Sequence, residues 1–290
     1  MIGVSPAYFI CRYGDRFSPE HVISGLKDLA QLGYQALQLE VYHADSITLW
    51  TSSGFARIIS AAGGNNLVVS QCVAHLLLHA FADEATLFSP WGVAEAAAIS
   101  AALPPDRCPV LTIPVPAFDV SAAPVANAGA WRRIEDRFEE KLSAMVSEIE
   151  QRGLRVALEV MPGSLVGGIQ GFLRLCERLE NRGHDKLGFN LDTGHAWASR
   201  EPLGLSITRL QGRILGTHLC DNWASENLSL APGSAGIDWP PLLSTLSSAG
   251  YSGSFDIEIH CPADQVLDQY ASARLFLADI SAQNQIKEPA

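Results

Sequence analysis

Eight runs of apolar, strand-forming residues recur along the chain, and each is followed by a helical pattern or a long loop. This alternation limits the fold most, because strands separated by helices pair in parallel through crossover connections. The runs occupy residues 3–10, 36–43, 66–76, 108–117, 155–163, 187–196, 214–222 and 254–260. Eight such units in 290 residues predict a (β/α)₈ TIM barrel, an α/β fold in which residues 1–290 form a single domain.

An open, doubly wound sheet is the alternative fold. It would carry a glycine-rich phosphate turn after its first strand, and the first run, GVSPAYFICRYG, has no G-x-G-x-x-G pattern. The helix between the first two runs has clear boundary signals, with Ser18 as N-cap, Pro19 at the first helical position and Gly33 as the stop. These signals favour the barrel.

Composition and charge narrow the class of partner. The net charge of −11 argues against broad capture of nucleic acid, which needs clustered Lys and Arg. No apolar stretch is long enough to span a bilayer, and the first residues lack the pattern of a signal peptide. The six cysteines are far apart and form no C-x-x-C pair, which is typical of reduced thiols in the cytoplasm. We therefore expect a cytoplasmic protein that acts on a small molecule and binds neither nucleic acid nor membrane, and the sequence leaves open whether it forms an oligomer.

Ionisable residues stand at the ends of four consecutive predicted strands. They are Glu159, Asp192, His218 and Glu258, and in a barrel the carboxyl ends of the strands carry the active site. Buried charges are costly unless they are paired or bound to metal, and no Lys or Arg accompanies these four. Three carboxylates and one imidazole suit Mn²⁺, Mg²⁺ or Co²⁺, and also Zn²⁺. The set therefore predicts one divalent metal ion.

Each of these residues also has a structural interpretation. Asp192 could cap the next helix, Glu159 could pair with an arginine, and His218 could be a hydrogen-bonded core residue. In the stretch LDTGHA, we expect Gly194 to let the backbone turn sharply behind Asp192. Taken together, four such residues at adjacent strand ends favour the metal site.

Five short motifs carry a family resemblance: ALEVMPG, LDTGHA, HLCDN, PGSAGIDW and DIEIH, in that order. Through them the chain resembles the xylose isomerase-like TIM barrel superfamily of sugar isomerases and epimerases, with endonuclease IV as a distant relative. The resemblance is close in the C-terminal half and limited to the strand rhythm in the N-terminal half. It implies that Glu159, Asp192, His218 and Glu258 hold one metal, that the two glutamates act as acid and base, and that His195 contacts the substrate.

The chemistry of such a site is that of proton transfer. A metal that bridges the carbonyl and hydroxyl oxygens of a ketose acidifies the C–H bond between them. One carboxylate removes that proton to give an enediolate, and a second carboxylate returns a proton. Return to the opposite face gives epimerisation, and return to the neighbouring carbon gives isomerisation. The predicted function is a metal-dependent isomerase or epimerase of a sugar or sugar derivative.

Three rival functions remain open. A lyase or dehydratase would use the same proton abstraction and then expel a leaving group. An endonuclease IV-like enzyme would need further ligands, namely a histidine in VLTIPVPA and an Asp-x-His pair where the chain has Asn227-Leu228-Ser229. A non-catalytic sugar-binding barrel would not need two bases.

Several weaker expectations concern the substrate pocket. We expect Glu40 and His75, on the second and third predicted strands, to contact substrate. The motif PGSAGIDW reads as a glycine turn with Asp238 as a helix N-cap, although a phosphate could bind there. Some epimerases have an arginine shortly after the strand-seven histidine, and the stretch CDNWASEN has none. Four tryptophans near strand ends would form either an apolar wall or core packing: Trp50, Trp91, Trp197 and Trp223.

Overall fold

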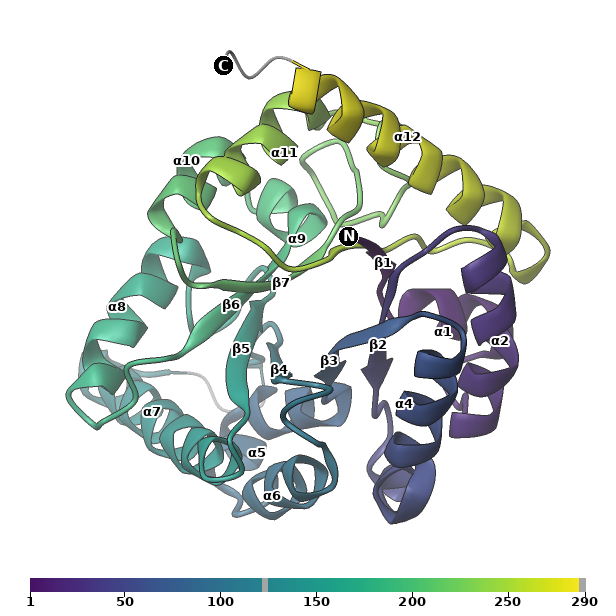
Figure 1. Ribbon diagram of the computed structural model, residues 1–290. Coiled ribbons are helices and arrows are strands. Elements are labelled where there is room, and N and C mark those ends of the chain that lie inside the picture. The colour runs from purple at the N-terminus through teal and green to yellow at the C-terminus, as the bar shows by residue number, and fades with distance from the viewer. Residues whose placement is uncertain (122–124, 287–290) are drawn as a thin grey trace.

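The computed structural model describes residues 1–121 and 125–286, and its eight parallel strands form a barrel at the centre of the molecule (Figure 1). Their order around the barrel is β7-β6-β5-β4-β3-β2-β1-β8. Their bounds are β1 Ile2–Val4, β2 Ala36–Glu40, β3 Val68–Val73, β4 Val110–Val115, β5 Arg155–Val160, β6 Gly188–Asp192, β7 Ile214–His218 and β8 Phe255–Ile257. Every strand lies within a predicted run except that β1 begins one residue earlier, so the (β/α)₈ barrel is confirmed and the open sheet is wrong.

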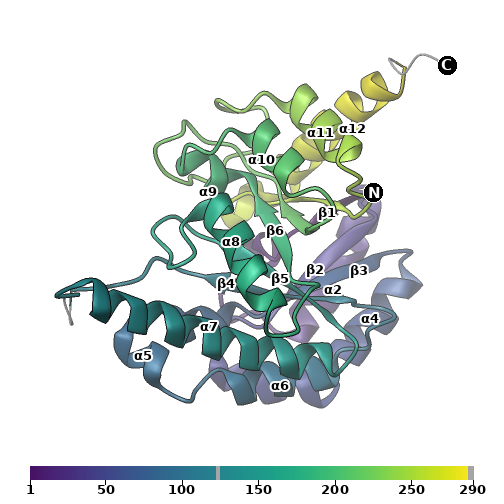
Figure 2. The ribbon, with the colours of Figure 1, turned by 90° about the vertical axis from the view of Figure 1, so that its left-hand side faces the viewer.

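The helices surround the barrel, as Figures 1 and 2 show from two directions. The α-helices are α1 Ala7–Tyr13, α2 Pro19–Gln31, α3 Ile47–Leu49, α4 Phe55–Gly64, α5 Glu84–Phe88, α6 Val93–Ala102, α7 Ala128–Glu150, α8 Gly168–Glu180, α9 Thr193–Ala198, α10 Leu203–Arg209, α11 Trp239–Ser248 and α12 Val266–Ile286. Short helical turns lie at η1 Ala44–Ser46, η2 Trp50–Gly54, η3 His75–Phe81 and η4 Ala263–Gln265. The predicted signals of α2 are confirmed, since Ser18 is its N-cap and Gly33 follows its end with φ of 82°.

The barrel closes through a short contact between β7 and β8. The backbone N–H of Leu219 donates to the carbonyl oxygen of Asp256 at 2.8 Å, and that of Glu258 donates to the carbonyl oxygen of Leu219 at 3.0 Å. Strand β1 pairs with both β8 and β2, which completes the ring. The closing contact therefore fixes the backbone of Glu258 beside the end of β7.

The barrel interior holds two layers of polar side chains, one above the other. Residues two apart on a strand share a face, so each of the pairs Gln38 and Glu40, Asn190 and Asp192, and Asp256 and Glu258 contributes one member to each layer. We call Gln38, Gln71, Thr112, Asn190 and Asp256 the lower layer, and Glu40, Glu159, Asp192, His218 and Glu258 the upper layer.

Small residues on neighbouring strands make room for the lower layer. A Cβ atom at Gly216 would lie 2.4 Å from Oδ1 of Asn190, and one at Gly3 would lie 1.9 Å from Oδ1 of Asp256. Apolar side chains on the other face of the strands pack against the helices and form the main hydrophobic core.

No helix within the described ranges is both long and apolar enough to cross a membrane. All six cysteines are unpaired, and four of them are buried. Residues 122–124 and 287–290 lie outside the described part of the chain, so a single domain over 1–290 stays a prediction, as do the cytoplasmic location and the oligomeric state.

Candidate metal centre and active site

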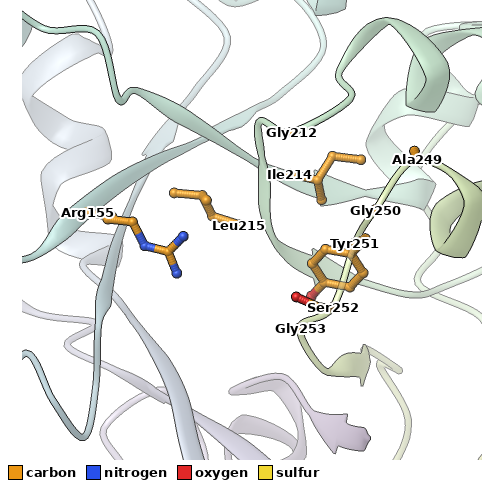
Figure 3. A pocket seen from close by; sticks show the side chains of 9 residues that line it. All are labelled: Arg155, Gly212, Ile214, Leu215, Ala249, Gly250, Tyr251, Ser252 and Gly253. Atoms are coloured by element: carbon orange, nitrogen blue, oxygen red, sulfur yellow. The ribbon is translucent and has the colours of Figure 1, made fainter.

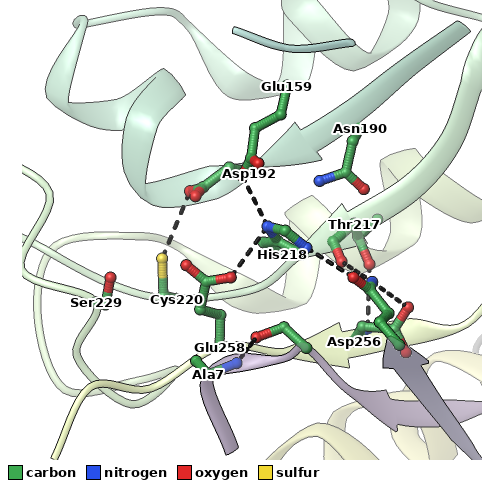
Figure 4. Close-up of polar contacts among 12 residues, drawn as sticks. Ala7, Glu159, Asn190, Asp192, Thr217, His218, Cys220, Ser229, Asp256 and Glu258 are labelled. Carbon is green, nitrogen blue, oxygen red and sulfur yellow. Dashed lines mark hydrogen bonds and ion pairs between the residues drawn. The ribbon is translucent and has the colours of Figure 1, made fainter. Parts of the chain in front are cut away.

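The four predicted ligands meet at one end of the barrel, where the strands terminate (Figure 4). Glu159 lies in β5, Asp192 and His218 are the last residues of β6 and β7, and Glu258 directly follows β8. Asp192 and His218 are paired in the β6–β7 register, which places them at the same height. The parallel sheet is therefore what brings together residues that are distant in sequence.

His218 lies between two glutamates. Its Nδ1 is 2.7 Å from Oε1 of Glu159 and 3.0 Å from Oε2 of Glu258. Burial lowers the pKa of His218, but the charges of Glu258 and Glu159 outweigh it and raise that pKa well above 6.5. Burial raises the pKa of Glu258, but the nearby His218 outweighs it and lowers that pKa to about 2. Without a metal, the imidazolium is the local counter-charge for these carboxylates.

The two carboxylate oxygens of Asp192 have different surroundings, and the helix cap expected from the sequence is confirmed. It is the N-cap of α9, since its Oδ1 accepts a hydrogen bond from the backbone N–H of His195 at 2.9 Å. Its Oδ2 is buried and has no hydrogen-bond partner, although Nε2 of His195 approaches to 3.4 Å. Burial raises the pKa of Asp192 to about 6. One oxygen is therefore structural and the other is available to a ligand.

The donor set fits a divalent metal ion. Ligand atoms of Asp192, His218 and Glu258 all lie within 4.8 Å of one another, and so do those of Glu159, Asp192 and His195. The two groups share Asp192, so they form one cluster. No other group of this kind occurs in residues 1–121 and 125–286. Carboxylate oxygens and imidazole nitrogen suit the predicted ions.

The expectation for Gly194 was wrong. Gly194 lies inside helix α9 and has no left-handed φ, so it makes no sharp turn. A Cβ atom there would lie 2.2 Å from Oδ1 of Asn227 and 2.5 Å from Sγ of Cys220. The glycine is needed because the loop after β7 packs directly against the start of α9.

A cavity of about 480 Å³ opens above this cluster. Glu40 and His75 line it, with Oε1 of Glu40 at 3.2 Å from Nδ1 of His75, and Tyr42 stacks on the His75 ring at 4.0 Å between ring centres. Burial raises the pKa of Glu40. Burial alone would lower the pKa of His75, but the hydrogen bond and charge of Glu40 outweigh burial, so the pKa of His75 is raised. None of the described residues that line this cavity is Arg or Lys.

Some lining residues were not found from the sequence. Tyr42 and Met161 supply apolar surface, and Asn227 approaches His195 with its Nδ2 3.3 Å from Nδ1 of the histidine. The four tryptophans considered for an apolar wall do not line the cavity. Tyr42 could have been found from strand alternation, because it lies two residues beyond Glu40.

The PGSAGIDW motif is structural. The carboxylate of Asp221 accepts hydrogen bonds from the backbone N–H groups of Gly233, Ala235 and Ile237 at 3.0–3.1 Å and from Nε1 of Trp239 at 3.0 Å. The amides that a phosphate would need are therefore already used. Asp238 occupies the N-cap position of α11, as predicted, but its side chain makes no capping hydrogen bond.

A second pocket, of about 320 Å³, has a different lining (Figure 3). Arg155, at the amino end of β5, lines it together with Ile214, Leu215 and residues 249–253. Its described lining includes no histidine and no carboxylate. The ionisable cluster thus belongs to the carboxyl ends of the strands.

Comparison with known proteins gives a family and a fold. Residues 26–280 match the model of a family described as xylose isomerase-like TIM barrel. An uncharacterized protein of Sinorhizobium fredii, y4fM, is 27% identical over 110 residues, which is 37% of this chain and 34% of that protein. The match thus spans about a third of that relative's length.

Three solved structures share the fold across nearly the whole chain. An L-ribulose 3-epimerase has a TM-score of 0.73, 15% identity and 99% coverage of both chains. A D-psicose 3-epimerase from Clostridium cellulolyticum, solved with D-tagatose, has a TM-score of 0.70, 15% identity and coverage of 96% of this chain and 98% of that one. The IOLI protein with a bound zinc atom has a TM-score of 0.69, 13% identity and the same two coverages.

Proposed function

The chain belongs to the xylose isomerase-like TIM barrel family, and from this premise we propose that it is an isomerase or epimerase of a sugar or sugar derivative that depends on one divalent metal ion. The observation that carries the proposal is the meeting of buried carboxylates with one imidazole at the strand ends, where no described Lys or Arg lines the cavity. The structural similarity to two sugar epimerases and to a zinc-bound protein supports it.

The residues that would hold the ion are Glu159, Asp192, His218 and Glu258. The unpartnered Oδ2 of Asp192 and the Nδ1 of His218, which already contacts both glutamates, are the donors best placed for it. A bound divalent ion would supply Lewis acidity, which weakens a C–H bond next to a carbonyl group of the substrate. Mn²⁺, Co²⁺, Mg²⁺ and Zn²⁺ all accept such ligands.

Glu159 and Glu258 are the proposed acid and base. Glu159 comes from β5 and Glu258 directly follows β8, and they approach His218 from different sides (Figure 4). One carboxylate would remove the substrate proton, and the other would return a proton to the opposite face or to the adjacent carbon. The first outcome is epimerisation and the second is isomerisation.

The cavity lining supports an uncharged substrate. Glu40 and His75 form a hydrogen-bonding pair suited to a sugar hydroxyl, and His195 with Asn227 offers a second polar contact. No described lining residue is Arg or Lys, and Asp221 already uses the amides of the loop after β7. A free sugar or polyol derivative therefore suits the site better than a sugar phosphate.

The Glu40–His75 pair also favours a second candidate function, that of a lyase. Glu159 or Glu258 would take the proton from carbon, and the neighbouring C–O bond would break with its electron pair leaving on oxygen. The pKa of His75 is raised, because the effect of Glu40 outweighs that of burial. His75 could therefore donate a proton to that oxygen and release water. The mass of the product distinguishes the two functions, because a lyase product is lighter by one water molecule.

The first experiment measures the metal content of the purified protein by mass spectrometry. We expect about one divalent ion per chain, since the four proposed ligands form a single cluster, and weakened binding in Glu159→Gln, Asp192→Asn, His218→Ala and Glu258→Gln. His184→Ala and Glu139→Gln are matched controls, because both residues are buried and paired, with Glu150 and Arg178 respectively. Ketoses would then be screened for deuterium uptake from solvent.

The outcomes separate the candidate functions. No metal in the wild type after addition of Mn²⁺, Co²⁺ or Zn²⁺ would rule out the proposed function. Metal without deuterium uptake by any sugar would favour a sugar-binding barrel. Three ions per chain would instead favour the endonuclease-like alternative.

A further inference from the structure

The second ring nitrogen of His218 has a defined partner inside the barrel. Its Nε2 lies 2.8 Å from Oε1 of Gln38, a fully buried residue of β2. The amide nitrogen of Gln38 donates to the carbonyl oxygen of Thr217 at 3.1 Å and to Oδ2 of Asp256 at 2.8 Å. Both of these partners have only acceptor oxygens at those positions, so the orientation of the Gln38 amide is determined.

This orientation determines which ring nitrogen of His218 keeps its hydrogen when a metal ion binds. Because Oε1 of Gln38 is an acceptor, Nε2 of His218 must carry the hydrogen that it receives. The Nδ1 atom is then the nitrogen that can offer a lone pair to the upper layer. We propose that Gln38 is a positioning residue, which holds His218 in the tautomer and ring orientation that a metal ligand requires, and this inference rests on the proposed metal site.

Asp256 holds Gln38 in place. Besides the bond from Gln38, its Oδ2 accepts from Oγ of Ser254 at 2.7 Å and from Oγ of Ser70 at 3.3 Å. Gly3 leaves the space that this carboxylate occupies. The chain from His218 through Gln38 to Asp256 thus links β7, β2 and β8 across the barrel. Partners of this kind orient metal-binding histidines and raise the basicity of the ligand nitrogen.

The barrel contains a matched residue that lacks this link. Gln71, on β3, is also buried in the lower layer. Its Nε2 donates to Oδ1 of Asn190 at 2.8 Å, and its Oε1 accepts from Oγ1 of Thr112 at 2.8 Å. It contacts none of the four proposed ligands through these bonds. A change at Gln71 therefore reproduces the loss of a buried amide without touching His218.

The test compares Gln38→Met with Gln71→Met. Methionine is close to glutamine in length and removes both the donor and the acceptor. Zn²⁺ affinity would be measured by competition with a chelator. We expect Gln38→Met to weaken binding by about 10–100-fold, and Gln71→Met to leave affinity unchanged even if both variants lose stability. Asp256→Asn should weaken binding in the same direction but less, since an amide oxygen is a poorer acceptor than a carboxylate.

Nitrogen-15 NMR of the zinc-loaded protein gives a second readout that does not depend on activity. In the wild type, His218 should show a protonated Nε2 and a zinc-bound Nδ1, and Gln71→Met should show the same spectrum. In Gln38→Met, the ring nitrogen signals of His218 should broaden or should no longer show this single tautomer.

The results distinguish the failure of this inference from the failure of the proposed function. If the wild type binds Zn²⁺, and Gln38→Met and Asp256→Asn bind it with the same affinity as Gln71→Met, the positioning role alone is overturned. Absence of Zn²⁺ binding by the wild type would overturn the proposed function and this inference with it. If Gln38→Met does not fold, Asp256→Asn and the wild-type NMR spectrum decide.

Discussion

The upper and lower layers of the barrel interior occupy the same strands, yet they are built from different chemistry. The lower layer consists of amides and hydroxyls with one carboxylate, Asp256. An amide carries both donors and acceptors, so Gln38 and Gln71 can satisfy their neighbours within the layer. The upper layer has four carboxylates and one histidine, and ionised carboxylates only accept.

This difference indicates that the lower layer mainly stabilises the fold and the upper layer mainly serves function. The lower layer fills the barrel and pairs most of its polar groups, although Nδ2 of Asn190 and Oδ1 of Asp256 have no hydrogen-bond partner among the described residues. The upper layer depends on His218, and on any cation that joins it, for positive charge. Changes in the upper layer should therefore act on metal binding and catalysis. Changes in the lower layer should act mainly on folding, with Gln38 and its partner Asp256 as the exceptions that connect the two layers.

The largest effect is expected in the upper layer from Glu258→Gln. Loss of this base should reduce deuterium exchange into the substrate by about 10²–10⁴-fold, measured with any ketose that the wild type labels. Glu139→Gln, which alters a buried glutamate paired with Arg178 away from the site, should keep full exchange. Undiminished exchange in Glu258→Gln would contradict the catalytic role of the upper layer.

In the lower layer, Gln71→Met should destabilise the fold and leave the metal site intact. It removes the partners of Asn190 Oδ1 and Thr112 Oγ1, both of which are buried. Two unpaired groups should lower the free energy of unfolding by about 2–4 kcal/mol, measured by urea denaturation of the chelator-treated protein. A loss of metal affinity instead would mean that the two layers are not separable.

Gly216→Ala tests how tightly the lower layer is packed. The new methyl group would lie 2.4 Å from Oδ1 of Asn190 and 2.5 Å from Oε1 of Gln71. We expect a loss of about 1–3 kcal/mol in the free energy of unfolding. Gly204→Ala is the matched control, because nothing lies within 4 Å of its Cβ position, and it should be neutral or stabilising. Equal stability of the two variants would contradict the packing argument.

The smallest expected effect is the change in metal affinity for each pH unit, which arises because a proton competes with the metal ion at His218. The pKa of His218 is well above 6.5 in the metal-free protein, since the charges of Glu258 and Glu159 exceed the effect of burial. Below that pKa a metal ion must displace a proton, so affinity should fall by about tenfold for each unit that the pH decreases. Titration calorimetry in two buffers of different ionisation enthalpy should detect about one proton released per ion. Affinity independent of pH between 6 and 7 would contradict this.

Strand positions could be predicted from the sequence for a physical reason, but the predicted runs extend past the strands, so that residues 7–10 lie in α1 and residues 193–196 in α9. Parallel strands present their carboxyl ends at one rim, so Glu159, Asp192, His218 and Glu258 meet there whatever the loops do. The features of the site that could not be predicted depend on contacts between residues far apart in sequence. The bond of Gln38 to His218 joins positions 180 residues apart, and the space that Gly194 leaves is occupied by Asn227 and Cys220 of another loop.

The sequence by itself determined the barrel, the rim on which the ionisable residues gather and the hard character of the proposed metal ligands, because these depend on local periodicity and residue type. Only the tertiary structure decided which oxygen of Asp192 is used by the helix cap, which nitrogen of His218 faces the site, and that Asp221 fills the loop where a phosphate could have bound. These are matters of hydrogen-bond partnership across the barrel, and partners are chosen by distance in space, which the order of residues along the chain does not contain.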